Sequence, residues 1–119
     1  MTDAFEPWFP LCDLTLSQIP EHGKLAAVYV LRDRITGEIL KYGCTGNMRA
    51  RIFGNYVGGV GGTTTQRIHE QLFVNGMISR VEIAWIETRD QAEAKSKETE
   101  FRRTYKKTHG KRPAWDLMD

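Results

Sequence analysis

The chain has 119 residues, of which 40% are hydrophobic and 27% charged, and its formal net charge is +2. This balance is typical of one globular domain with its own core and excludes a disordered chain. No apolar run approaches the roughly 20 residues that span a bilayer, and the first residues lack the pattern of a signal peptide. We therefore expect a cytoplasmic protein with no membrane partner.

Basic residues gather in the C-terminal third of the chain. Between Glu93 and Arg112, eight basic residues stand against three acidic ones. Such a patch suits a polyanion such as DNA, although an ordinary solvated helix face has a similar composition. The residues predicted to bind nucleic acid are Arg102, Arg103, Lys106 and Lys107.

The first half of the chain predicts an arm followed by a hairpin. Residues 1–22 hold three prolines and form the predicted N-terminal arm, whereas residues 23–119 form the predicted domain. Apolar runs at Leu25–Leu31 and Glu38–Cys44 flank turn-forming residues, which is typical of an antiparallel β-hairpin. After the hairpin, Asn47 can cap a helix that runs to Phe53, and the glycines from Gly54 to Gly62 then predict a mobile loop.

The second half predicts a helix, a strand and a longer helix. Residues Thr63 to Asn75 read as a helix, and Ser79–Ile86 alternates like a half-buried strand. Asp90 can cap a helix that ends near His109, where a glycine follows. The predicted fold class is α+β, with a three-stranded antiparallel sheet flanked by helices.

Glu98 is the most informative single residue. It shares one helix stripe with Ala94, Phe101 and Tyr105, which are residues that pack on a sheet, so its carboxylate is expected to point inward. An unpaired buried carboxylate costs several kcal/mol, so it must meet a cation, a metal ion or strong hydrogen-bond donors. Both a structural salt bridge and a metal site satisfy this requirement.

Four short motifs carry a resemblance to a known family. Ala27-Val28-Tyr29 and Lys41-Tyr42-Gly43 occupy the two predicted hairpin strands, and Cys44 to Arg51 continues the second motif as C-T-G-N-M-R-A-R. Ala94 with Glu98 and the segment 112–116, R-P-A-W-D, complete the set. In this order and spacing they resemble the catalytic domain of the GIY-YIG nucleases over about residues 20 to 117.

The resemblance implies roles for three residues. Tyr29 matches the tyrosine that polarises or deprotonates the attacking water, Arg51 the arginine that holds the scissile phosphate, and Glu98 the single metal ligand. One Mg²⁺ or Mn²⁺ ion per site is implied, with water and substrate oxygens completing its coordination. A buried structural Tyr29 and a surface Arg51 are the alternatives.

The chain departs from the family pattern at three places. Lys41 stands where the family has its second tyrosine, and Tyr42 takes the usual isoleucine position. Because neighbours on a regular strand face opposite sides, either Lys41 or Tyr42 enters the site, and a regular register favours Lys41. Asp116 replaces an asparagine. His69 is the central candidate for the family's histidine and equally fits an ordinary surface residue.

The resemblance implies a divalent-metal-dependent endonuclease that hydrolyses phosphodiester bonds in DNA. A homodimer that cuts both strands is compatible with the sequence. The alternatives are a degenerate domain of the same fold that binds nucleic acid without cutting it, and a regulatory protein whose basic helix docks on an acidic partner. Lys41 and Asp116 favour the degenerate domain, whereas retention of the other motif residues favours the enzyme.

Overall fold

In the computed structural model of the chain, which describes residues 5–14, 19 and 26–117, four strands form one antiparallel sheet. The strand order is β1-β4-β2-β3, with β2 at Ala27–Asp33, β3 at Ile39–Thr45 and β4 at Val81–Glu87. These three strands are the predicted ones, and the predicted start at Leu25 lies outside the described residues. The fold class is therefore α+β, as predicted.

The fourth strand comes from the segment predicted as an arm. β1, at Phe9–Pro10, pairs with Ile83 and Glu82 of β4. The short helix η1 (Leu11–Asp13) follows, and Leu11 belongs to the main hydrophobic core. A two-residue strand with a proline at a sheet edge leaves no period that sequence analysis can detect, which is why three strands were predicted.

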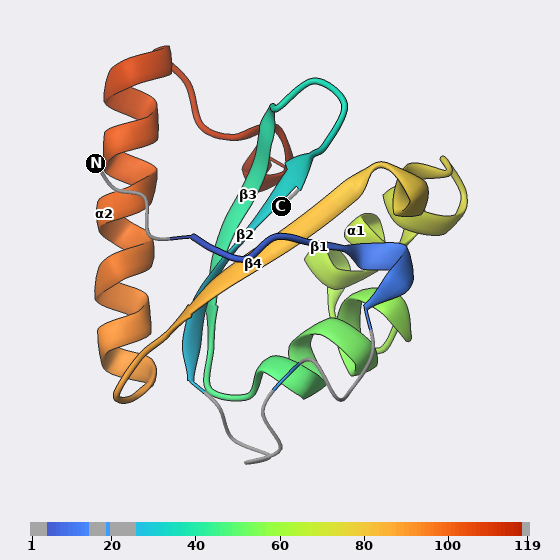
Figure 1. The fold of residues 1–119 in the computed structure, drawn as a ribbon, viewed down its shortest axis with the longest axis horizontal. Coiled ribbons are helices and arrows are strands. Elements are labelled where there is room, and N and C mark those ends of the chain that lie inside the picture. The colour runs from blue at the N-terminus through green and yellow to red at the C-terminus, as the bar shows by residue number, and fades with distance from the viewer. Residues whose placement is uncertain (1–4, 15–18, 20–25, 118–119) are drawn as a thin grey trace.

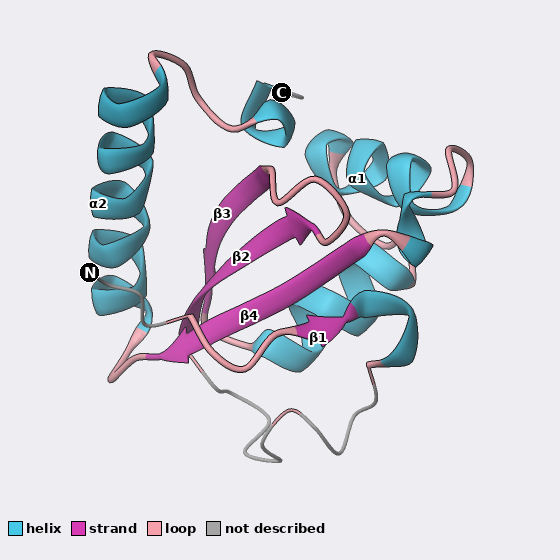
Figure 2. Cartoon of the chain, turned by 45° about the horizontal axis from the view of Figure 1, so that its top comes forward, coloured by secondary structure: helices cyan, strands magenta, loops and turns pink. Residues whose placement is uncertain are grey.

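The sheet lies between two groups of helices. Figures 1 and 2 show α2 (Gln91–His109) along one side, beside β3, and α1 (Thr63–Phe73) on the other. The side chains of Ile68 and Leu72 from α1 pack with the tyrosine-bearing face of the sheet in the main core. None of the helices in the described ranges is long and apolar enough to cross a membrane.

The segment between β3 and α1 departs from the prediction. Helical structure does not end at Phe53 but continues through Gly54 as η3 (Ala50–Val57), an eight-residue π-helix. Asn47 accepts a hydrogen bond from the amide of Ala50, as expected of a capping residue. Gly54 is tolerated because burial of Ile52 and Tyr56 anchors the segment on both sides of it.

The C-terminus folds back onto β3. After α2, Gly110 adopts a left-handed conformation and ends the helix, and the short helix η5 (Ala114–Leu117) follows. Buried Trp115 joins the main core and fixes this turn against the sheet. The red segment of Figure 1 shows the turn folding back toward β3. The fold thereby brings both α2 and η5 to the edge strand β3.

Candidate active site

A pocket of about 160 Å³ lies where β2, β3, η3 and α2 meet and α1 begins. Of the residues predicted from the sequence, Tyr29, Lys41, Arg51 and Glu98 line it. They come from four separate elements, so the tertiary fold brings them together. Tyr42 and His69 do not line it, and Tyr56, which was not predicted, does.

The β2–β3 ladder places Tyr29 and Lys41 on one face. Tyr29 lies opposite Gly43, and Leu31 lies opposite Lys41. The register is regular from Lys41 to Thr45 and shifts only between Leu31 and Arg32. This is the regular register that was predicted, in which Lys41 and Gly43 share a face, and Lys41 lines the pocket.

The hydroxyl groups of Tyr29 and Tyr56 share a hydrogen bond of 2.5 Å. Both residues are almost fully buried, at 1% and 2% exposure. Burial raises the pKa of Tyr29 well above its ordinary value; the Tyr56 hydroxyl raises it further, and the nearby Arg51 guanidinium opposes the shift. Burial also raises the pKa of Tyr56, although its bond with Tyr29 and the charge of Arg51 lower it in part. Both groups are therefore neutral phenols near pH 7.

The π-helical winding of η3 explains why Arg51 and Tyr56 both reach the pocket. In an α-helix, residues five apart are separated by about 140° around the axis. In a π-helix the backbone hydrogen bonds join residues five apart, which aligns Arg51 with Tyr56. The Nε atom of Arg51 is buried and has no hydrogen-bond partner among the described residues. Such a donor suits an anionic ligand, because leaving it unpaired is costly.

Other features of the pocket also favour an anion. Thr64 and Thr65 line it from the first turn of α1, so the positive end of that helix faces the pocket. The N-cap of α1 is Gly62, which supplies no capping side chain. Positive potential therefore converges on the pocket from Arg51, Lys41 and the start of α1.

Glu98 is 4% exposed and is surrounded by cations of its own helix. Its Oε1 atom lies 2.9 Å from Lys95 Nζ and 3.5 Å from Arg102 Nη1. The hydrogen bond to Glu98 raises the pKa of Lys95. Burial and the charge of Glu98 raise the pKa of the neighbouring Cys44 thiol, which therefore stays protonated. The inward carboxylate predicted from the helix stripe is confirmed, and salt bridges contribute to its burial.

Lys41 and Asp116 form a buried ion pair. The Lys41 Nζ atom lies 3.3 Å from Asp116 Oδ1, and both residues are less than 10% exposed. They are 75 positions apart in sequence, on β3 and η5. The two departures from the family pattern thus contact one another.

Tyr42 and His69 have other surroundings. Tyr42 faces the side of the sheet that α2 covers, where its ring stacks on Phe101 at 5.5 Å. His69 packs on Phe73, and its Nδ1 donates to the carbonyl oxygen of Tyr56 at 2.9 Å. His69 thus supports the backbone of a pocket residue from behind, with its ring outside the pocket lining.

The four basic residues predicted to bind DNA lie on different sides of α2. Arg102 is half-buried and pairs with Glu98 and Asp116, so it belongs to the pocket wall. Arg103, Lys106 and Lys107 are exposed. At about 100° per residue, Lys106 lies nearest the Glu98 side, whereas Arg103 and Lys107 point away from it.

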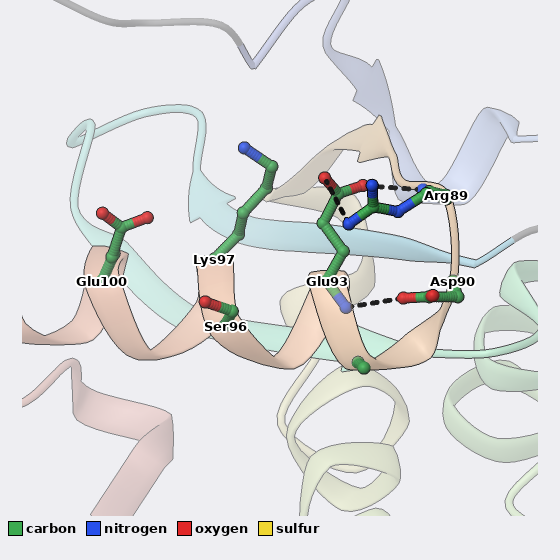
Figure 3. Close-up of a pocket in the computed structure, with 7 residues that line it drawn as sticks. Arg89, Asp90, Glu93, Ser96, Lys97 and Glu100 are labelled. Atoms are coloured by element: carbon green, nitrogen blue, oxygen red, sulfur yellow. Dashed lines mark hydrogen bonds and ion pairs between the residues drawn. The ribbon is translucent and has the colours of Figure 1, made fainter.

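A larger surface hollow, of about 400 Å³, lies at the start of α2 (Figure 3). Arg89, Asp90 and Glu93 satisfy one another there: the amide of Glu93 donates to Asp90 at 2.8 Å, and the amide of Arg89 donates to Glu93 at 2.7 Å. Glu93 thus reaches back to the amide before the N-cap residue Asp90, which is a variant of the capping box found at helix starts. The smaller pocket at Tyr29 is therefore the better candidate site.

The donor set of the pocket suits a hard divalent cation held by one protein ligand. Among the described residues, no three His, Cys, Asp or Glu side chains gather to form a metal cluster, and Glu98 is the carboxylate that lines the pocket. Mg²⁺ often takes one carboxylate and completes its shell with water and substrate oxygens. The side chain of Lys95 is 63% exposed, so solvent leaves it room to move away from Glu98.

Tyr56 lines the pocket but was not predicted from the sequence, and the same is true of Thr64 and Thr65. The sequence does place Tyr56 five residues after Arg51. This spacing puts the two side chains on one face of the helix only if the helix is wound as a π-helix. Glycines on both sides, Gly54 and Gly58, instead indicated a loop.

No protein-family model matches the chain, and neither a curated protein nor a solved structure matches it significantly. The functional argument therefore rests on the pocket itself.

Proposed function

We propose that this protein is a divalent-metal-dependent endonuclease of the GIY-YIG type, which hydrolyses phosphodiester bonds in DNA. One observation carries the proposal: Tyr29, Lys41, Arg51 and Glu98, which the motifs select from the sequence, line a single pocket. A chance set of motif residues from four elements has no reason to converge in this way.

The size and charge of the pocket support a phosphate group as its occupant. A volume of about 160 Å³ is below the roughly 300–1,000 Å³ of pockets that enclose drug-sized ligands. A backbone phosphate fits, whereas a nucleoside stays outside. The pocket therefore acts on the backbone, and any preference for a target sequence arises elsewhere on the surface.

Each pocket residue has a distinct role in this proposal. Arg51 binds a non-bridging phosphate oxygen through its unpaired donor, and Lys41 adds a second cation. The Tyr29 hydroxyl orients the attacking water while it remains hydrogen-bonded to Tyr56. Because burial keeps Tyr29 neutral, it positions the water through its lone pair, and the Tyr56 hydroxyl holds the Tyr29 hydroxyl from behind.

Glu98 would hold the metal ion. When bound there, the ion would offset charge on the phosphate and lower the pKa of a coordinated water. The protein supplies the fixed carboxylate, which Arg102 and Lys95 orient from neighbouring turns of α2.

The test is cleavage of supercoiled plasmid with Mg²⁺ or Mn²⁺, with and without EDTA, by the wild type and by Glu98→Gln. We expect nicking or linearisation that requires metal and is lost in Glu98→Gln, because the amide keeps the shape but not the charge. Glu100→Gln is the matched control, since Glu100 is exposed on the same helix. Equal cleavage by Glu98→Gln and Glu100→Gln would disprove the proposal.

The second candidate function is a domain of the same fold that binds DNA without cutting it. The ion pairs of Lys41 with Asp116 and of Glu98 with Lys95 favour it, because they satisfy site charges internally. Salt-dependent DNA binding by the wild type without metal-dependent cleavage would establish this alternative.

A further inference from the structure

Asp116 contacts two cations at the wall of the pocket. Its side chain is 2% exposed, and its Oδ1 atom lies 3.3 Å from Lys41 Nζ and 3.3 Å from Arg102 Nη2. Its Oδ2 atom lies 3.1 Å from Arg102 Nε. One buried carboxylate thus joins a lysine on β3 to an arginine on α2.

The position of Asp116 is fixed by its turn. The preceding Pro113 and Trp115 are buried, and the amide of Asp116 donates to the carbonyl of Pro113 at 3.1 Å. The Asp116 carboxylate is therefore held in one place, where it can orient the flexible side chains of Lys41 and Arg102. A lysine has four rotatable side-chain bonds and loses considerable rotamer entropy when it is held in one place.

Stability alone is a weak reason for this arrangement. Burying two charges costs several kcal/mol in lost hydration, which their mutual attraction often only repays. The Lys41 ammonium has three donor hydrogens, and Asp116 accepts one of them. Among the described residues Asp116 is the hydrogen-bond partner of Lys41, so the other two hydrogens can be donated to oxygens of a phosphate in the pocket that Lys41 lines.

Arg102 extends the same arrangement to the metal ligand, since its Nη1 atom lies 3.5 Å from Glu98 Oε1. We propose that Asp116 is a positioning residue that holds Lys41 for phosphate binding and Arg102 against Glu98. This inference rests on the proposed function, because it takes the phosphate of DNA as the ligand of Lys41.

Whether DNA affinity rises or falls when Asp116 is replaced separates this positioning role from a simple charge effect. Removing a carboxylate near a DNA-binding surface should strengthen DNA binding, because one repulsive charge is lost. If Asp116 positions Lys41, its removal should weaken binding instead. The measurement is the affinity for a short DNA duplex in EDTA at several salt concentrations, using the full chain.

We expect Asp116→Asn to weaken duplex binding about tenfold, as for the loss of one charge-assisted hydrogen bond. The slope of the logarithm of DNA affinity against the logarithm of salt concentration should decrease by about the amount expected for one phosphate contact. Lys41→Met should do the same, and the double variant should lose no more than either single one. Glu100→Gln, which also removes one negative charge from an exposed position, should bind as tightly as the wild type or more tightly.

Asp116→Glu is the second variant, because Asp116→Asn leaves Lys41 without its partner and can destabilise the fold. Its charge is unchanged and its carboxylate is displaced by one methylene, so weaker binding can only reflect position. Circular dichroism checks that each variant is folded. Wild-type affinity in Asp116→Glu, or tighter binding in a folded Asp116→Asn, would overturn the positioning role.

The same experiment distinguishes this inference from the proposed function. If the wild type binds the duplex and cleaves plasmid with metal, but both Asp116 variants match it, only the positioning role fails. If the wild type neither binds nor cleaves DNA, both proposals fail.

Discussion

The ring of Tyr29 occupies the space that a side chain at position 43 would need. Gly43 lies directly opposite Tyr29 in the β2–β3 ladder, and a Cβ atom there would collide with the Cζ atom and hydroxyl of Tyr29 and lie 2.8 Å from its Cε1 atom. The tyrosine of one motif therefore requires the glycine of the other. Sequence analysis can recognise that the two motifs occur together, and this contact gives a physical reason for their pairing.

Gly43→Ala should therefore displace the Tyr29 ring. We expect a loss of about 1–3 kcal/mol in the free energy of unfolding, as for an overpacked core, and a fall in cleavage rate of at least about tenfold. Gly54→Ala is the control, since a Cβ there meets nothing within 4 Å. Denaturant unfolding and single-turnover cleavage measure the two effects. Equal behaviour of the two variants would contradict the proposed role of the Tyr29 position.

Removing the hydroxyl that Tyr29 contacts tests the Tyr29–Tyr56 pair. Tyr56→Phe keeps the ring and leaves the Tyr29 hydroxyl without its partner, so we expect about 1 kcal/mol less stability and a cleavage rate reduced about 10- to 100-fold. Tyr42→Phe is the matched control, because its ring stacks on Phe101 away from the pocket. If only Tyr42→Phe lost cleavage, the assignment of the pocket would be wrong.

Regular periods made most of the fold predictable. The strand β4 follows from alternation, β2 and β3 from apolar runs of strand length that flank turn-forming residues, and α1 and α2 from helix spacing and capping residues. The period of two on β3 placed Lys41 rather than Tyr42 in the pocket. Tyr56 could not be predicted, because π-winding depends on the burial of neighbouring side chains and leaves no periodic signal. The Lys41–Asp116 pair was equally hidden, since it joins residues 75 positions apart.

The position of the basic residues around α2 predicts two classes of DNA-binding variant. The double variant Lys95→Gln/Lys106→Gln removes charges near the Glu98 side, so duplex affinity and the salt slope in EDTA should both fall. Arg103→Gln/Lys107→Gln removes the same net charge from the opposite side and should have a smaller effect. Equal losses in the two variants would mean that DNA contacts the helix elsewhere.

The interactions of Asp33, at the turn after β2, predict how the free energy of unfolding depends on pH. Asp33 is 4% exposed, accepts hydrogen bonds from the amides of Ile35 and Thr36, and pairs with Arg80 at 2.7 Å. Burial acts to raise the pKa of Asp33, but these hydrogen bonds and Arg80 outweigh it, so the pKa is lowered. The native state thus favours the ionised form more than the unfolded state does.

A lowered pKa stabilises the fold at pH values above the ordinary aspartate value of about 3.9, and this stabilisation is lost as the pH falls through the native value. Asp33→Asn should therefore be less stable than the wild type by about 1 kcal/mol at pH 7, and the difference should shrink as the pH falls below about 4. Urea unfolding at pH 7, 5, 4 and 3 measures it. Asp13→Asn, which removes a charge from an exposed residue, is the control and should show no such convergence. A difference between Asp33→Asn and the wild type that stays constant down to pH 3 would mean that Asp33 acts through hydrogen bonds that survive protonation.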